Sequence, residues 1–298
     1  MDAHQACDLC SSAGNVVVGR RDRHFRPLTN VLCLNCGLIR QDPLPSEEEL
    51  RDYYARRYRL HYKGVTKPST FDVHRDEHRA QVRMDVIAPV LPENARLLDV
   101  GSGNGTFLRL ARERGCRVQG IEPNIGYAEW AKRQFGIDAV HGGWADATFP
   151  PAAFDFITAH HVLEHLRSPT AALKQFHHWL APGGHLYISV PNLADRKASP
   201  LNRFHSAHLH GFSRRTLIMM ALKAGFERVK LPKTAGTTHV FRRLDTPPDD
   251  WMIFPQHGRE LHAFLLKHNM LRYVLGPDPY RGWIRRLAER IRLHAAAS

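Results

Sequence analysis

The sequence contains no run that approaches the roughly 20 consecutive apolar residues of a membrane-spanning helix. Its first ten residues, MDAHQACDLC, lack the basic region and the apolar stretch of a secretory signal, so we expect a cytoplasmic protein. Acidic residues are also scarce, because 29 Asp and Glu stand against 42 Lys and Arg and leave a net charge of +13. This excess favours either a nucleic-acid or phosphate-bearing partner or a solvated basic surface, since net charge governs association and not chemistry.

In other respects the composition is that of a globular enzyme. The chain has 298 residues, which is enough for one enzyme domain with small additions. Hydrophobic residues make up 43% of it and charged residues 24%, and these values exclude a disordered or fibrous chain. We find no internal repeat, so the informative features are local motifs.

Cysteine is rare but regularly placed. Four of the five cysteines form two Cys-x2-Cys pairs separated by 22 residues: Cys7, Cys10, Cys33 and Cys36. Two such pairs supply the four thiolates of a tetrahedral zinc site, at a spacing close to that of zinc ribbons. The valine-rich runs at residues 16–18 and 31–32 are expected to form short strands of such a ribbon. Because four protein ligands leave no open position, the expected Zn²⁺ is structural and not catalytic.

From about residue 95 onward, short strand-like runs alternate with longer helical patterns. Strands are expected at residues 96–100, 117–122, 154–159 and 185–190, and helices at about 104–114, 124–135 and 170–180. Strands that alternate with helices of this length indicate βαβ units and a mainly parallel sheet. Two later runs, residues 226–231 and 238–244, are close enough to pair as a terminal antiparallel hairpin.

Two helices are expected between the cysteine pairs and this alternating region. Ser46 and Glu49 form a capping-box pattern, which predicts a helix that begins there and continues to Tyr58. A second helix is expected over residues 75–90, with Val82, Val86 and Ile87 on one face.

The most informative stretch is the loop after the first strand of the alternating region. Residues 97–105 read LLDVGSGNG, with three glycines in Gly-x-Gly-x-Gly spacing that let the backbone turn closely under a ligand. A dinucleotide-binding loop would instead carry Gly-x-Gly-x-x-Gly to hold a pyrophosphate. Asp99 would repel a pyrophosphate but could organise the ammonium end of a ligand that bears an amino acid. Glu122 ends the next strand, where a carboxylate can accept both hydroxyls of a ribose.

With these two motifs the chain resembles the class I S-adenosylmethionine-dependent methyltransferases over about residues 95–245. LLDVGSGNG is similar to the first motif of that family and GIEPN to the second. FDFITAHHVLEHLRSP is similar to the block around the fourth strand, and LAPGGHLYISVPN to the turn and strand that follow. The resemblance implies a Rossmann-like α/β fold with a mainly parallel seven-stranded sheet and a terminal antiparallel hairpin, preceded by the small four-cysteine ribbon.

The resemblance also implies a methyl donor, S-adenosyl-L-methionine, and the residues that bind it. Six residues would contact the donor: Asp99, Gly101 and Gly103 at the methionine end, Glu122 at the ribose, Trp144 beside the adenine, and His160 near the transferred methyl. At the adenine the usual Gly-Asp pair of the family is replaced by the segment 143–146.

Four segments follow from these assignments. We expect a zinc ribbon over residues 1–45, a helical linker or lid over 46–92, the donor-binding methyltransferase domain over 93–246, and a helical extension over 247–298. In the extension, helical spacing continues from Trp283 to Ile291. This pattern is typical of a core-facing helix or a dimer contact, and a homodimer is one expected assembly.

Histidines follow the fourth strand and recur after the fifth strand, at His205, His208 and His210. Methyl transfer to a hydroxyl often requires removal of its proton, and histidine suits this role because its pKa lies near neutrality. Our catalytic candidates are His161 and His208. Alternatively His161, Glu164 and His165, spaced as if on one helical face, could hold a cation. That pattern resembles the Glu-x-x-Glu-His motif of quinone-pathway O-methyltransferases, with His161 in place of the first acid.

The leading hypothesis is O-methylation of a small or carrier-linked acceptor, such as a sugar, glycan precursor or secondary metabolite. The N-terminal pattern CLNCGLIRQDPLPSEEELRDYYARRY resembles a zinc-ribbon subgroup that is often linked to such acceptors. The basic loop from Asp195 to Arg203 could recognise a phosphate on the acceptor. The alternatives are an RNA methyltransferase that uses the ribbon and the basic surface, a scaffold with a vestigial donor site, and C-methylation of a sugar.

Overall fold

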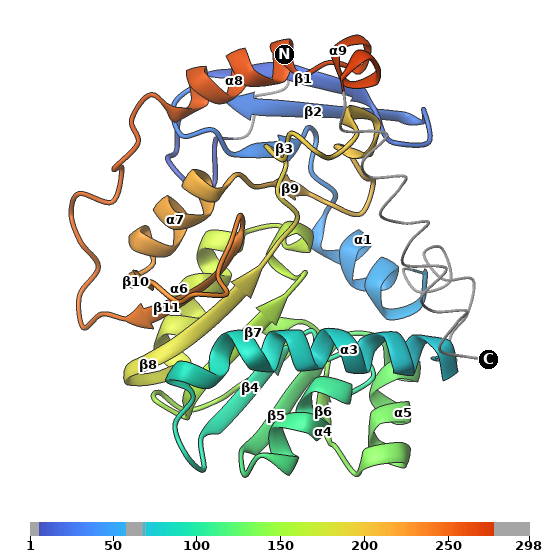
Figure 1. Cartoon of the computed structure of the whole chain (residues 1–298), viewed down its shortest axis with the longest axis vertical. Helices are drawn as coiled ribbons and strands as arrows, with labels where there is room; N and C mark the ends of the chain where they lie inside the picture. The colour runs from blue at the N-terminus through green and yellow to red at the C-terminus, as the bar shows by residue number, and fades with distance from the viewer. Residues whose placement is uncertain (1–5, 58–67, 69, 277–298) are drawn as a thin grey trace.

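Two β-sheets form the framework of the molecule (Figure 1). The computed structural model describes residues 6–57, 68 and 70–276. In Figure 1 a four-stranded sheet with helix α8 forms the upper part, and a seven-stranded sheet with helix α3 across its front forms the lower part. Among the described residues, no helix combines the length and the apolar character needed to cross a membrane.

The larger sheet has the strand order β10-β11-β8-β7-β4-β5-β6. Its strands are β4 (Arg96–Val100), β5 (Arg117–Glu122), β6 (Ala139–His141), β7 (Phe154–His160), β8 (Leu180–Ser189), β10 (Phe226–Val229) and β11 (Thr238–Arg243). All neighbouring pairs are parallel except those of β11, which is antiparallel to both β10 and β8. The Rossmann-like sheet and its antiparallel hairpin are therefore confirmed, whereas the three-residue β6 was too short to be recognised from the sequence.

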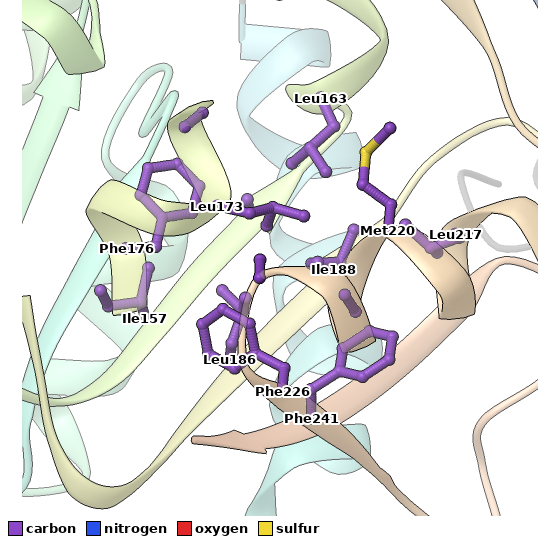
Figure 2. Close-up of a cluster of buried hydrophobic side chains, with 14 of the residues drawn as sticks. Ile157, Leu163, Leu173, Phe176, Leu186, Ile188, Leu217, Met220, Phe226 and Phe241 are labelled. Atoms are coloured by element: carbon purple, nitrogen blue, oxygen red, sulfur yellow. The ribbon is translucent and has the colours of Figure 1, made fainter. Parts of the chain in front are cut away.

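Helices cover both faces of this sheet, and their apolar stripes form two cores. One face carries α3 (Thr70–Ile87), α4 (Thr106–Glu113) and α5 (Ile125–Phe135), and the other carries α6 (Pro169–Trp179) and α7 (Arg214–Lys223). On the second face, Leu173 and Phe176 of α6 and Met220 of α7 pack over Ile188 of β8 and Phe241 of β11 (Figure 2). This packing fixes the strand ends that carry the candidate site.

Helix α3 differs from the expected one in its start and in its buried face. It begins at Thr70, five residues earlier than expected, and Val82 is 52% exposed. Val86 and Ile87 are buried as predicted, and Ala80 and Met84 are buried beside them. The prediction was wrong for Val82, because a residue two positions from both Ala80 and Met84 lies on the opposite side of the helix.

The smaller sheet contains the ribbon strands and one strand from far along the chain. Its order is β1 (Asn15–Arg21), β2 (Pro27–Cys33), β3 (Ile39–Gln41) and β9 (His210–Gly211), and every pair is antiparallel. Helix α8 (His257–Lys267) covers it, with Leu261 and Leu265 against Leu32 and Ile39. The expected strands at residues 16–18 and 31–32 are confirmed, whereas no pattern in the sequence indicated that β9 completes the sheet.

A short helical segment, here called the lid, follows strand β3 in the chain. Helix α1 (Glu47–Asp52) begins after Ser46, whose hydroxyl accepts from the Glu49 N–H at 3.1 Å while Glu49 accepts from the Ser46 N–H at 2.7 Å. The predicted capping box is therefore confirmed. A π-helical turn η1 (Tyr53–Arg57) follows, and near the other end of the described chain lies α9 (Met270–Leu275). The predicted extension to Tyr58 and the expected helix from Trp283 to Ile291 lie outside the described residues.

Candidate active site

The two Cys-x2-Cys pairs meet at one point of the smaller sheet. The sulfur atoms of Cys7 and Cys36 are 3.5 Å apart, as are those of Cys10 and Cys33. All four sulfurs lie within 4.8 Å of one another, and none forms a disulfide. Zinc bound by four thiolates at about 2.3 Å holds them about 3.8 Å apart, so this cluster fits a structural zinc ion.

The cysteine cluster is packed against the helices of the larger sheet. Asp8, between the first two cysteines, accepts from the hydroxyl of Ser168 at 2.6 Å and from the N–H of Thr170 at 2.9 Å. These groups lie at the start of α6, and Lys223 of α7 donates to the carbonyl oxygen of Leu9. The ribbon and the α6–α7 face therefore share one hydrophobic core.

The glycine loop lies at the carboxyl edge of the parallel strands, between β4 and α4. Gly101 and Gly103 have φ angles of +73° and +58°, in the left-handed region that favours glycine. A Cβ atom on Gly101 would lie 2.8 Å from Cγ2 of Val162, just beyond the end of β7. The loop and the histidine-rich segment after β7 are therefore in close contact.

Asp99 lies in β4 directly before this loop and is 1% exposed. Its Oδ1 accepts from Nη1 of Arg83 at 2.7 Å and from the hydroxyl of Thr158 at 2.5 Å. Burial raises the pKa of Asp99, and the charge of Arg83 and the bond from Thr158 oppose that rise. Sequence reasoning missed Arg83 because it lies in α3, outside every motif, and only the packing of α3 brings it to the loop.

Glu122 at the end of β5 joins two backbone segments. Its Oε2 accepts from the N–H of Gly103 at 2.7 Å, and its Oε1 accepts from the N–H of Asn124 at 3.0 Å. The side chain is 2% exposed. One carboxylate thus connects the glycine loop to the turn after β5, at the strand end where the sequence placed a ribose-binding acid.

The remaining two predicted donor residues lie on the same edge. Trp144 opens the short helix η3 (Trp144–Asp146) after β6 and is partly buried against the core. His160 ends β7, with its Nδ1 3.2 Å from the hydroxyl of Tyr187. Burial, assisted by the nearby charge of Arg83, moves the pKa of His160 far below its ordinary value. The six predicted donor residues therefore gather around one edge of the parallel strands.

His161 directly follows β7 and is held by a buried carboxylate. Its φ of +55° is uncommon for a residue other than glycine, and its N–H donates to the carbonyl oxygen of Ser189 at 2.8 Å. Its Nδ1 lies 3.0 Å from Oε1 of Glu164, which is 1% exposed, whereas the His161 side chain is 51% exposed. An ionised carboxylate only accepts hydrogen bonds, so Nδ1 of His161 carries the proton that it donates to Glu164. The lone pair of Nε2 is then available to accept a proton from another group.

The three residues of the alternative cation site, His161, Glu164 and His165, do not lie on one helix. Glu164 and His165 lie in a single 3-10 turn, η4 (Leu163–His165), and His161 precedes that turn in a left-handed conformation. The prediction that these residues share one helical face was wrong, because the chain turns sharply after β7. Burial works against ionisation of Glu164, but the hydrogen bond from His161 and the charges of the neighbouring histidines keep its pKa below the ordinary value.

The second catalytic candidate, His208, approaches the same carboxylate from another segment. Its ring packs edge-on against His165, with centroids 5.0 Å apart, and stacks on His205 at 4.7 Å. Burial, with a further contribution from His165, lowers the pKa of His208 to about 3, so the ring is neutral at physiological pH. Ligand atoms of Glu164, His165 and His208 lie within 4.8 Å of one another, which makes these three residues the geometrically suited cation ligands.

A cavity of about 240 Å³ lies between the smaller sheet and the segments after β8. His208 lines it, together with polar groups that include Asn30, Asn192, Ser199, Asn202 and Arg203. The aliphatic side chain of Ile39 and the ring of Phe204 supply apolar surface. Hydrogen-bonding groups beside apolar patches are typical of a site for a small polar molecule.

The lid formed by α1 and η1 lies over the donor-side turns. The side-chain amide of Asn124 donates to the carbonyl oxygen of Ala55 at 3.1 Å, and Arg51 lies 3.7 Å from Asp146. The hydroxyl of Tyr54 donates to the carbonyl oxygen of Ala207 on the cavity side. The lid therefore contacts both halves of the candidate site.

Comparison with known proteins identifies the family. Residues 73–231, more than half of the chain, match the family described as a methyltransferase domain. The chain belongs to this family. The matched region contains the glycine loop, Glu122 and the histidines after β7.

Relatives of the methyltransferase match only part of it. The ubiquinone biosynthesis O-methyltransferase of Xylella fastidiosa is 32% identical over 121 residues, which cover 37% of this chain and 48% of that protein. The biotin biosynthesis bifunctional protein BioHC of Cellvibrio japonicus is 27% identical over 163 residues, or 53% of this chain and 32% of that protein. The chain spans about half the length of the ubiquinone-pathway relatives that it matches.

Among solved structures, the fold is similar to that of 1,6-didemethyltoxoflavin-N1-methyltransferase from Burkholderia thailandensis. That protein was solved with 1,6-didemethyltoxoflavin and S-adenosylhomocysteine bound. The TM-score is 0.50 at 21% sequence identity, and the similarity covers 72% of this chain and 96% of that one. The likeness establishes the shared fold.

Proposed function

We propose that this methyltransferase transfers a methyl group to an oxygen atom of a small or carrier-linked acceptor that binds in the cavity between the smaller sheet and the segments after β8. The observation that carries the proposal is the pairing of His161 with Glu164 beside the glycine loop. A hydroxyl acceptor must lose its proton as it attacks, and Nε2 of a histidine oriented through Nδ1 can take it. The ubiquinone-pathway relatives are named O-methyltransferases, which supports the same acceptor atom.

The donor would lie along the edge formed by the ends of β4, β5 and β7. When bound, S-adenosyl-L-methionine supplies a methyl group on a positively charged sulfonium. Asp99, Gly101 and Gly103 are assigned to its methionine end, and Trp144 is assigned to its adenine. His160, neutral because of its lowered pKa, would lie near the sulfonium without repelling it.

Glu122 is assigned to the ribose. Its carboxylate oxygens accept the backbone N–H groups of Gly103 and Asn124, and a carboxylate at this strand end is the type of group that accepts ribose hydroxyls. The carboxylate would then fix the donor relative to the glycine loop.

The four-cysteine cluster is assigned a structural Zn²⁺. Its four ligands, Cys7, Cys10, Cys33 and Cys36, are all supplied by the protein, so no position is open for a substrate. The ion would stabilise the ribbon and, through Asp8, the start of α6.

The acceptor class that best matches the cavity is a hydroxyl-rich small molecule, such as a sugar or a glycan precursor. Amide side chains at Asn30, Asn192 and Asn202 can both donate to and accept from hydroxyl groups. Arg203 lines the cavity and belongs to the basic loop from Asp195, which supports an acceptor that carries a phosphate.

The test uses methyl-labelled S-adenosylmethionine, the purified protein and a cell extract separated into RNA, lipid or glycan, and small-molecule fractions. We expect label in the glycan or small-molecule fraction. Transfer should fall at least tenfold in both Asp99→Ala and His161→Ala, but only Asp99→Ala should weaken S-adenosylhomocysteine binding. Full transfer by His161→Ala would contradict the assigned base.

RNA is the second candidate acceptor because of the net charge of +13. Label in the RNA fraction, with binding that weakens steeply as salt rises, would favour it over the leading proposal. A cation held by Glu164, His165 and His208 is the alternative to a histidine base. Loss of transfer on adding a chelator, restored by a divalent metal while the zinc content stays constant, would favour the cation.

A further inference from the structure

The segment from His205 to Leu209, here called the histidine loop, is held through its own carbonyl oxygens. Gln41 at the end of β3 binds most of them. Its Nε2 lies 2.9 Å from the oxygen of Ser206, 3.0 Å from that of His208 and 3.4 Å from that of His205. Its backbone N–H donates to the oxygen of Leu209 at 2.9 Å. An amide has two N–H groups, so it can satisfy the two nearest carbonyls, Ser206 and His208, at once.

The remaining carbonyl group of the loop, that of Ala207, faces the lid and the turn after β7. The oxygen of Ala207 accepts from the hydroxyl of Tyr54 at 3.0 Å and lies 2.8 Å from Nδ1 of His165. The histidine loop is therefore fixed between β3 on one side and the turn after β7 on the other. The contact of the His208 ring with His165 depends on both attachments.

The side chain of Gln41 is not needed to form the sheet. Strand β3 pairs with β9 in two residue pairs, Ile39 with Gly211 and Arg40 with His210. The Gln41 amide is 4% exposed and, in the described part of the chain, donates only to the histidine loop. Its loss would leave buried carbonyl oxygens without donors, and the loop would have to move to reach water.

We propose that Gln41 is a positioning residue of this methyltransferase, which holds the histidine loop so that His208 faces the acceptor cavity. The inference rests on the proposed function, because it places His208 on the acceptor side. Gln41 belongs to the same ribbon as Cys36, so the ribbon completes the acceptor site besides stabilising the chain. Donor binding is expected to be independent of Gln41, because Asp99 and Glu122 are held by other elements.

The test compares Gln41→Met with the matched control Gln119→Met. The amide of Gln119 also donates to two carbonyl oxygens, those of Gly120 and Asp138, but it lies in β5. The reaction of each histidine with diethyl pyrocarbonate is followed by mass spectrometry, because this reagent modifies accessible neutral imidazoles. Binding of S-adenosylhomocysteine and label transfer to the accepting extract fraction are measured on the same proteins.

In Gln41→Met we expect the modification rate of His208 to rise at least fivefold, while those of the buried His239 and His257 stay within twofold. Label transfer should fall at least tenfold, with the Kd of S-adenosylhomocysteine unchanged within twofold. In a His208→Ala background, Gln41→Met should cause no additional loss, because residues that act through one another are not additive. Gln119→Met should match the parent protein in all of these measurements.

An unchanged modification rate at His208, or a loss of transfer that persists in the His208→Ala background, would overturn the inference. Failure of the proposed function is seen separately, as full transfer by His161→Ala. If Gln41→Met does not fold, as judged by zinc content and Tm, Gln41→Asn is measured instead, since its amide is one methylene too short to reach the loop. The modification rate of His208 and the extent of label transfer then decide the outcome for Gln41→Asn.

Discussion

A single carboxylate, that of Glu122, connects two of the backbone segments that surround the donor. Both of its oxygens accept backbone N–H groups, from Gly103 and Asn124. In Glu122→Gln, one of the two accepting oxygens is replaced by an NH2 group. This group cannot accept a hydrogen bond from the backbone N–H that faces it. Hydrogen bonds to a charged group contribute about 1.5–3 kcal/mol, so the Kd of S-adenosylhomocysteine should rise about 10- to 100-fold in calorimetry.

The control for this prediction is Glu129→Gln. Glu129 lies on α5 in an exposed ion pair with Arg133, at 3.4 Å, and its replacement should leave the Kd unchanged. Equal affinities for Glu122→Gln and the parent protein would remove Glu122 from the donor site.

A second prediction concerns the pH dependence of stability through Asp155. Hydrogen bonds from the Arg96 side chain, at 2.7 Å and 3.1 Å, hold the pKa of Asp155 below its ordinary value of 3.8. A lowered pKa means that the ionised form stabilises the fold above about pH 4, and that this contribution is lost as the pH falls through the folded-state pKa. Asp155→Asn should therefore cost about 1 kcal/mol in urea unfolding at pH 7, a value reduced for partial exposure.

At pH 3 the difference between Asp155→Asn and the parent protein should be smaller, because the carboxyl group of the unfolded state, with its ordinary pKa of 3.8, is then largely protonated. A difference in unfolding free energy that stays constant from pH 7 to pH 3 would show that ionisation of Asp155 does not contribute.

At the scale of elements, the short helix α1 depends on its cap. Six residues are too few for a stable isolated helix, and Ser46 with Glu49 closes its first turn. Ser46→Ala should destabilise α1 by about 1 kcal/mol. Because the following turn contacts Asn124 next to Glu122, the Kd of S-adenosylhomocysteine should rise about fivefold, while global Tm changes little.

Asn269→Ala is the matched control, since Asn269 caps α9 through the N–H of Arg272 at 3.1 Å, far along the chain from the lid. It should leave the Kd unchanged. If Ser46→Ala also leaves both the Kd and the proteolytic sensitivity of residues 46–57 unchanged, the lid does not contribute to donor binding.

For the whole molecule, the cysteine cluster lies at the junction of two sheets. We expect one zinc per chain by elemental analysis, and Cys36→Ser should abolish it. Loss of the metal should loosen the ribbon and the histidine loop that it supports, so protease should cleave within the ribbon, residues 6–45, and methyl transfer should be lost. The Kd of S-adenosylhomocysteine should stay within about threefold, because the donor-side contacts of Arg83 and Glu122 lie on the larger sheet.

Cys116→Ser is the control for that experiment, because Cys116 is buried in the other hydrophobic core. It should retain zinc and transfer. A zinc-free protein with unchanged Tm and protease resistance would refute the structural role of the metal.

The sequence alone determined the features that depend on neighbours in the chain. The capping box of Ser46, the positive-φ glycines at 101 and 103 and the alternation of strands and helices follow from local geometry, so their positions were predictable. The two Cys-x2-Cys pairs were also readable, because metal ligation constrains their spacing. The family motifs placed Asp99, Glu122 and His160 at strand ends, and parallel strands bring their carboxyl ends to one edge.

Only the tertiary structure decided which distant side chains meet there. Arg83 reaches Asp99 because α3 packs across the sheet, and His208 reaches Glu164 because β9 joins the ribbon strands. Gln41 is bonded to a loop more than 160 residues away, a contact that leaves no periodicity or spacing in the sequence. Such contacts depend on how elements pack, and packing is specified by the whole set of buried surfaces and not by any one segment.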